Sequence, residues 1–207
     1  MHEQNKHRTI KLFTQSQYYN VRSLKNMREI QIRIEGTAPL LQHKMSVEQE
    51  TALEIGATKK RGGEAKGDKP EEYLYMYNGV ICQPAEHIIQ AMLKKASQYV
   101  IKGKGKKTYK ELAQGSLNIV PEYIPHNNQS WTKDSRTVVI PATRGRSVRV
   151  RPRFDTWSLD FTLQLINDDM PINVVKGMLD DAGREGGIGD YRPRVGRFIV
   201  TSFKEVA

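Results

Sequence analysis

The sequence predicts an α+β fold in which strands and helices follow one another in the order βαββαβ. Three observations lead to this prediction. Polar and apolar residues alternate strictly in two stretches, and two segments that begin at a proline carry apolar residues at helical spacing. Two further β-rich runs complete the order. With its loops set aside, the chain has the ferredoxin-like, or RRM-like, arrangement of elements.

The first strand is expected where Ile30, Ile32 and Ile34 alternate with polar residues, and Gly36 ends it. Further along the chain, the dipeptide Asn78-Gly79 predicts a hairpin turn. Two short strands are therefore expected on either side of that dipeptide.

The first helix is predicted over residues 84–100. Pro84 suits the first turn of a helix, and apolar residues recur at helical spacing from Ile88 to Val100. After a lysine-rich stretch, apolar residues between positions 119 and 124 predict the second strand, which prolines interrupt.

The third strand has the clearest alternation in the chain. Its apolar face is Trp157, Leu159, Phe161, Leu163 and Leu165. Pro171 begins the second helix, and Gly183 stands where a C-cap glycine belongs. The fourth strand covers residues 197–203.

Residues 28–207 are predicted to form one domain, preceded by a basic N-terminal arm at residues 1–27. The segment 46–72 is rich in Lys, Gly and Glu and has little to bury, so it is expected to be a mobile insertion. It is either a basic finger that orders on a ligand or an insertion without that role. Residues 126–153 predict a basic hairpin before the third strand.

The 207 residues contain 33 Lys and Arg and 23 Asp and Glu, a net charge of +10. Such a surplus favours polyanion binding, with nucleic acid before an anionic membrane, although a merely basic protein is the plain alternative. The single cysteine, Cys82, excludes an internal disulfide and indicates a reducing compartment, so the cytoplasm is expected. The histidines lack metal-ligand spacing and no nucleotide motif is present, so no metal or cofactor is expected.

The segment 183–198 contains five glycines and four arginines. Glycine lets the backbone approach a ligand closely, and guanidinium groups bind phosphate. The alternative is a tight connection with solvated arginines. The residues expected here to contact nucleic acid are Arg184, Gly186, Gly187, Gly189, Arg192, Arg194 and Arg197.

Two other basic groups are expected to add phosphate contacts. One lies in the hairpin, at Arg144, Arg146, Arg149 and Arg151, and the other at Lys102, Lys104, Lys106 and Lys107. Trp131 is either a group that stacks on bases or a buried tryptophan.

These motifs resemble the CRISPR-associated RAMP superfamily. The sequences that carry the resemblance are IQIRIEGTAPLLQHKM, YNGVICQPAEHIIQAMLKKAS and GREGGIGDYRPRVGRF, together with the inserted hairpin. Within the superfamily, the chain is most similar to backbone subunits that polymerise along guide RNA. The resemblance implies a non-catalytic RNA-binding subunit of an antiviral ribonucleoprotein. Its partners are guide RNA, further copies of itself and other subunits, and its sheet face, glycine-rich loop and thumb-like hairpin grip the RNA.

Some members of that superfamily cut target RNA with an aspartate in the loop after the first strand, but residues 39–46 contain none. Guide-processing members use a histidine base, and His43 with Lys44 could form such a pair. A metal-independent endoribonuclease is therefore one alternative. A single-stranded DNA-binding protein of replication or recombination is another. A third is an interaction or virion component whose basic loops meet acidic protein surfaces.

Overall fold

The computed structural model describes residues 27–45, 69–139 and 144–206. The predicted N-terminal arm lies outside these ranges apart from Met27. Of the predicted insertion, only residues 69–72 are described. Three of these residues, 70–72, belong to a short 3-10 turn, Pro70–Tyr73 (η2). None of the described helices is long and apolar enough to cross a lipid bilayer.

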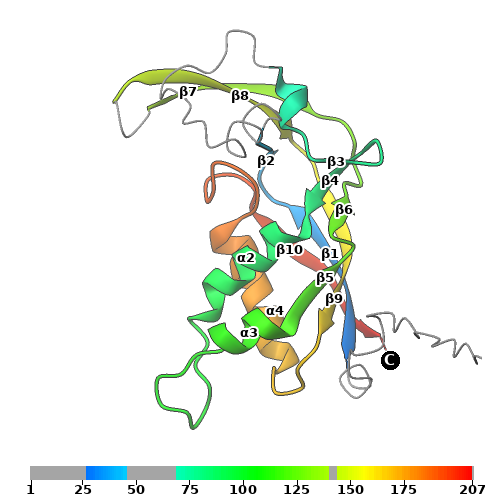
Figure 1. Ribbon diagram of the computed structural model, residues 1–207, viewed down its shortest axis with the longest axis vertical. Coiled ribbons are helices and arrows are strands. Elements are labelled where there is room, and N and C mark those ends of the chain that lie inside the picture. Colours follow the sequence, from blue (N-terminus) through cyan, green and yellow to red (C-terminus); the bar gives the residue numbers. More distant parts are fainter. Residues whose placement is uncertain (1–26, 46–68, 140–143, 207) are drawn as a thin grey trace, which may run out of the picture.

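The largest sheet has four antiparallel strands in the order β10-β1-β9-β5. The strands are β1 (Arg28–Gly36), β5 (Leu117–Val120), β9 (Ser158–Leu165) and β10 (Phe198–Val206). Three helices, α2 (Ala85–Ala96), α3 (Lys110–Ser116) and α4 (Ile172–Asp181), lie on one face of this sheet (Figure 1). The predicted α+β class is confirmed.

The hydrophobic core lies between the sheet and these helices. The predicted apolar faces of β1 and β9 point into it, since Ile30, Ile34, Leu159 and Leu163 are fully buried. Helix α2 begins after Pro84 and α4 after Pro171, as predicted. Helix α3 was not predicted, because its seven residues include few apolar side chains.

The predicted hairpin is a long antiparallel ribbon of β7 (Thr132–Val139) and β8 (Arg146–Phe154). A short strand, β2 (Leu40–Leu41), pairs with the end of β8 and ties the ribbon to the segment after β1. Figure 1 shows the ribbon extending away from the main sheet.

A small third sheet contains β3 (Met76–Tyr77), β4 (Val80–Pro84) and β6 (Tyr123–Pro125). The predicted turn at Asn78-Gly79 joins β3 to β4, with φ angles of 49° and 79°. These left-handed values suit an Asn-Gly hairpin turn.

The end of the second helix differs from the prediction. Helix α4 does not stop at Gly183 but continues through a π-helical turn, Ala182–Gly186 (η3), and the left-handed residue is Gly187, with a φ of 68°. Gly183 is buried, and a Cβ atom there would collide with the carbonyl oxygen and ring of Phe198. Glycine is therefore needed at 183 for close packing on β10, and the C-cap prediction is wrong.

Candidate nucleic-acid interface

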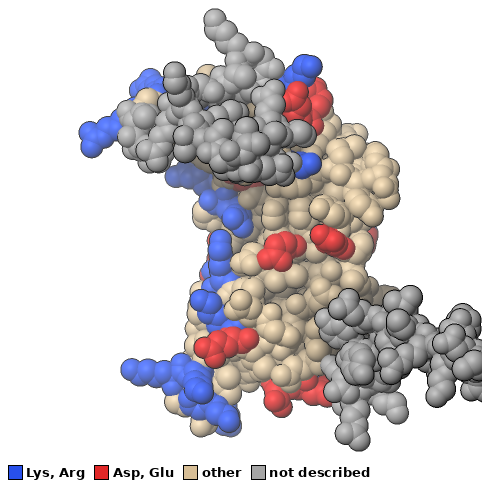
Figure 2. Space-filling model, viewed as in Figure 1, with Lys and Arg blue, Asp and Glu red and all other residues tan. Residues whose placement is uncertain are grey.

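On the face of the molecule drawn in Figure 2, positive charge gathers mainly along one margin. Figure 2 shows Lys and Arg side chains along one margin (left in the view), while the adjoining surface is mostly uncharged or acidic. Three segments contribute to this margin: the loop between α2 and α3, the loop between η3 and β10, and the ribbon. We call residues 97–109 the lysine loop and residues 187–197 the glycine loop.

The outer face of the main sheet is not basic. Its charged residues, at the pleat positions opposite the core, are Glu29, Arg33, Glu35, Asp160 and Lys204. Arg33 already forms ion pairs with Glu35 at 2.9 Å and Asp160 at 3.1 Å. With three carboxylates against two cations, this face does not attract a polyanion, so the sheet-face grip that the resemblance implies finds no electrostatic support.

The glycine loop is fastened to the protein by its backbone. The N–H of Asp190 donates to the carbonyl of Leu41 at 2.8 Å, and the N–H of Gly196 donates to the carbonyl of Pro39 at 2.8 Å. Within the loop, the N–H of Ile188 donates to the carbonyl of Gly196 at 2.9 Å. The buried side chains of Ile188 and Val195 add apolar contact.

The glycines of this loop serve packing, which corrects the predicted role of Gly187 and Gly189. A Cβ atom at Gly187 would lie 2.8 Å from the carbonyl oxygen of Val195, and one at Gly189 would lie 2.5 Å from that of Leu41. The N–H of Gly187 is also engaged, with the carbonyl of Ala182 at 2.7 Å. The loop therefore does not offer a row of bare amides to phosphate. Gly186 lines a surface hollow beside α2.

The arginines of the glycine loop point outward. Arg192, Arg194 and Arg197 are exposed, and Arg197 donates from Nε to the carbonyl of Pro193 at 2.9 Å. Among the described residues, no carboxylate forms an ion pair with these three. Arg184 is 71% exposed but pairs with Asp181 at 2.6 Å and Glu185 at 3.3 Å. These two carboxylates offset its positive charge and weaken its attraction for a phosphate.

Arg151 has a different role from the predicted one. Its side chain is 3% exposed and its Nε lies 2.5 Å from the carboxylate of Asp190. Burial opposes ionisation of Asp190, but the charge of Arg151 and a hydrogen bond from the N–H of Tyr191 outweigh it, so the pKa of Asp190 is lowered. Arg151 thus fastens the glycine loop to the ribbon and is not available to phosphate.

Strand alternation divides the other ribbon arginines between two faces. Arg149 shares the face of Arg151 and is half-buried, whereas Arg146 lies on the opposite face and is exposed. Arg144, just before β8, is also exposed. Trp131 is half-buried and packs against the core, which favours the structural alternative for this residue.

The lysine loop is held by its own backbone. The N–H of Ile101 donates to the carbonyl of Lys107 at 2.8 Å, and the N–H of Tyr109 donates to the carbonyl of Tyr99 at 2.9 Å. The four predicted lysines are exposed, and no ion pair with a described carboxylate is present for any of them. The members of this group are Lys102, Lys104, Lys106 and Lys107.

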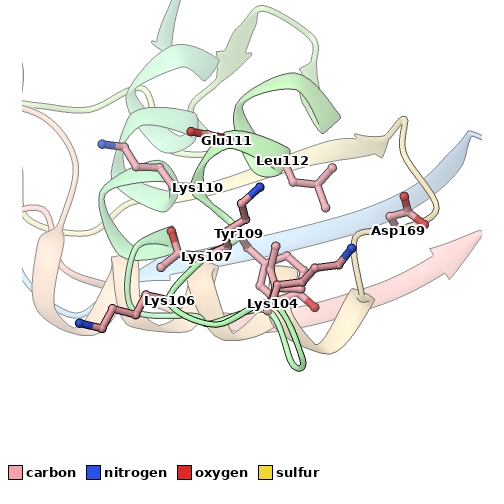
Figure 3. A pocket seen from close by; sticks show the side chains of 10 residues that line it. Lys104, Lys106, Lys107, Tyr109, Lys110, Glu111, Leu112 and Asp169 are labelled. Carbon is pink, nitrogen blue, oxygen red and sulfur yellow. The ribbon is translucent and has the colours of Figure 1, made fainter.

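Beside the lysine loop lies an open hollow of about 890 Å³. Lys104, Lys106, Lys107 and Lys110 line it, together with Asp169. In Figure 3 the amino group of Lys104 points toward Asp169, whereas those of Lys106 and Lys110 point to the other side. The four amines and their spread make the hollow suitable for several phosphates of one strand.

Helix α2 connects the two loops, a connection the sequence did not reveal. A hollow of about 480 Å³ is lined by Lys94 and Lys110, and one of about 360 Å³ is lined by Lys94, Lys95 and Arg192. Because neighbouring hollows share Lys110 and then Lys94, the surface is continuous. We call this surface, from the lysine loop past α2 to the exposed arginines of the glycine loop, the basic track.

The two lysines of α2 contribute unequally to the track. Lys94 is exposed, whereas the Lys95 side chain is 15% exposed and pairs with Glu185 at 2.6 Å. Both lie in the last turn of α2, where lysines are usually attributed to the helix dipole. The predicted helix ran on to residue 100, so the sequence placed these lysines before its last turn.

Two histidines, His87 and His126, have lowered pKa values and therefore add no charge at neutral pH. Burial, with the charge of Arg192, lowers the pKa of His87, against the effect of Glu86. Burial lowers the pKa of His126 to about 4. His43 stacks on Tyr73, with ring centroids 4.6 Å apart, so one face of its imidazole is covered. Within residues 27–45, 69–139 and 144–206, no three His, Cys, Asp or Glu side chains form a metal site.

Comparison with known proteins finds similar chains among solved structures only. No protein-family model matches the chain, and no curated protein matches it. A similar solved structure is a chain in the "Cryo-EM structure of the Type III-B Cmr-beta bound to cognate target RNA", with a TM-score of 0.49 and 11% identity. The similarity covers 87% of this chain and 61% of that chain, so this protein spans less than two thirds of the length of its match.

Proposed function

We propose that the protein binds single-stranded nucleic acid, with RNA as the preferred ligand, along the basic track. The observation that carries this proposal is the convergence of exposed cations from three segments, of which the glycine loop lies far along the sequence from the other two. These are the lysine loop, α2 at Lys94, and the glycine loop at Arg192 and Arg194. Uncompensated cations in a row follow a phosphodiester backbone and give binding with little sequence preference.

We further propose that this binding serves a CRISPR-type ribonucleoprotein, in which the chain is a non-catalytic subunit. The strand order β10-β1-β9-β5, with α2 between β1 and β5 and α4 between β9 and β10, supports a ferredoxin-like assignment. The glycine loop stands between the last helix and last strand of this unit, and the ribbon stands directly before β9. Both positions agree with the RAMP resemblance of the sequence.

The proposal is tested by fluorescence anisotropy with labelled RNA, DNA and duplex oligonucleotides of equal length over a series of salt concentrations. Arg192→Ala and Arg194→Ala are each expected to reduce the slope of log K against log salt by about 0.7 to 1. Lys204→Ala is the matched control, since it removes one exposed cation from the outer sheet face. The control is expected to leave the slope unchanged.

Other outcomes separate this proposal from its rivals. If Arg192→Ala, Arg194→Ala and Lys204→Ala all give the same salt slope, the basic track is not the binding site. Tighter binding of DNA than of RNA would support the single-stranded DNA-binding protein instead. Cleavage of RNA in a chelator by the wild type, but not by His43→Ala, would support the endoribonuclease.

A further inference from the structure

We propose that Tyr191 is the platform on which one base of the bound strand stacks. This inference rests on the proposed function and adds a base contact to a site that otherwise holds phosphates. Tyr191 lies in the glycine loop next to Arg192, and its side chain is 40% exposed.

Tyr191 has an unusual backbone conformation for an aromatic residue. Its φ angle is 60°, in the left-handed region that glycine and asparagine occupy far more readily than tyrosine. Such a conformation is strained and persists where the surroundings determine it.

The surroundings that determine it are visible. Asp190 is fixed by its N–H to the carbonyl of Leu41, at 2.8 Å, and by its carboxylate to Arg151. The backbone on the N-terminal side of the ring is therefore held in place before any ligand arrives.

The position of the ring does not serve the hydrophobic core. Tyr191 is not among the described side chains that form the core or pack against it. One partner is Arg136 of the ribbon, whose guanidinium carbon lies 5.2 Å from the ring centroid. A cation near one face leaves the opposite face of the ring for a base. Arg192 stands beside the ring for a phosphate, whereas Arg136 is already paired with Asp134 at 2.8 Å.

Four other aromatic side chains are less suitable. Trp131 and Tyr109 are partly buried against the core. Tyr77 and Tyr123 stack on each other, with centroids 5.1 Å apart, and belong to the small sheet of β3, β4 and β6. Tyr191 thus combines exposure with a neighbouring exposed arginine, Arg192.

The experiment compares Tyr191→Asn and Tyr191→Phe with the wild type. Asparagine tolerates the left-handed conformation but lacks the ring, so Tyr191→Asn tests the ring without straining the loop. For a single-stranded RNA, Tyr191→Asn is expected to weaken binding about 5- to 150-fold, the range for loss of one base–aromatic stack. Tyr191→Phe is expected to bind within about threefold of the wild type, since it keeps the ring.

The salt dependence distinguishes stacking from phosphate binding. Tyr191→Asn is expected to keep the wild-type salt slope, unlike Arg192→Ala, because no phosphate contact is lost. An RNA with 2-aminopurine at successive positions is expected to show one position that is quenched by the wild type and by Tyr191→Phe, but not by Tyr191→Asn.

The outcomes are distinct. If the wild type does not bind single strands, the proposed function fails. If the wild type binds and Tyr191→Asn binds equally well, or if its affinity and salt slope fall together, the stacking role is overturned while the proposed function stands.

Discussion

The glycine loop and the lysine loop have similar compositions and opposite relations to the rest of the protein. Both mix glycines with positive side chains and contain glycines with positive φ angles. A Cβ atom at Gly103 or Gly105 would meet nothing within 4 Å, whereas one at Gly189 or Gly196 would collide with backbone. The lysine loop is shaped by its own turns, whereas the glycine loop is shaped by the surface on which it lies.

This difference assigns the glycines and the arginines of the glycine loop to separate tasks. The glycines let the loop lie close to the segment 39–41, and the loop then presents Arg192 and Arg194 at a fixed place. Preorganised cations lose less conformational entropy on binding than mobile ones. The lysine loop presents positive charge on flexible four-carbon side chains, which are less constrained than the planar guanidinium groups of arginine.

The largest effect is expected when a glycine of each loop is replaced by alanine. Gly196 and Gly103 have φ angles of 73° and 78°, so the backbone strain of an alanine is nearly equal at the two positions. At Gly196 the new methyl group would also collide with the backbone of Ile188. We expect Gly196→Ala to reduce the free energy of unfolding by about 3 kcal/mol or more, and Gly103→Ala by about 1 kcal/mol.

Urea unfolding of both variants measures this difference directly. Gly196→Ala is also expected to weaken RNA binding, because it displaces the loop that carries Arg192. Equal losses of stability would contradict the close packing of the glycine loop.

A smaller effect is expected from Asp190→Asn, which leaves the buried guanidinium of Arg151 without its partner. The Asp190 side chain is 34% exposed, so we expect a loss of about 2–3 kcal/mol in the free energy of unfolding, below the full range for buried pairs. Asp160→Asn is the control, because it breaks a solvent-exposed pair with Arg33. Such a pair contributes less than about 1 kcal/mol.

The pH dependence of the same variant follows from the sign of the pKa shift. The pKa of Asp190 is lower in the folded protein than its ordinary value of 3.8, so the folded state favours the charged form. Its contribution is therefore complete above pH 3.8 and is lost as the pH falls through the folded value. The difference in stability between wild type and Asp190→Asn is expected to shrink as the pH falls below 3.8. A difference that stays constant down to pH 2 would contradict this account.

Local patterns in the sequence were enough to predict the strands and helices that bury one face against the core. The alternation around Leu159 and Leu163 identified β9, and Pro84 and Pro171 marked the starts of α2 and α4. These signals depend only on side-chain period and on the geometry of proline.

The candidate site depended on contacts that no local pattern contains. Arg151 is buried because Asp190, 39 residues further along the chain, lies beside it. The amides of Asp190 and Gly196 are engaged because the segment after β1 supplies carbonyl groups. Composition therefore predicted the charge of this region, whereas the fold determined which of its residues remain available to a ligand.

The smallest effect on stability is expected from the lysine loop, where substitutions should change nucleic-acid binding alone. The triple variant Lys104→Gln, Lys106→Gln and Lys107→Gln removes three exposed charges that form no ion pair with a described residue, so its free energy of unfolding is expected to stay within about 0.5 kcal/mol of the wild type. If the strand reaches the hollow beside this loop, each lost phosphate contact reduces the salt slope by about 0.7, or about 2 in total. The reduction is expected only for RNA long enough to reach from the glycine loop past α2, and short oligonucleotides bind the triple variant and the wild type alike. A reduction that is the same at every RNA length would mean that the lysines act through long-range attraction and not by contact with the strand. Such attraction is screened beyond about 8 Å at physiological salt. That result would show that the bound strand does not reach the lysine loop.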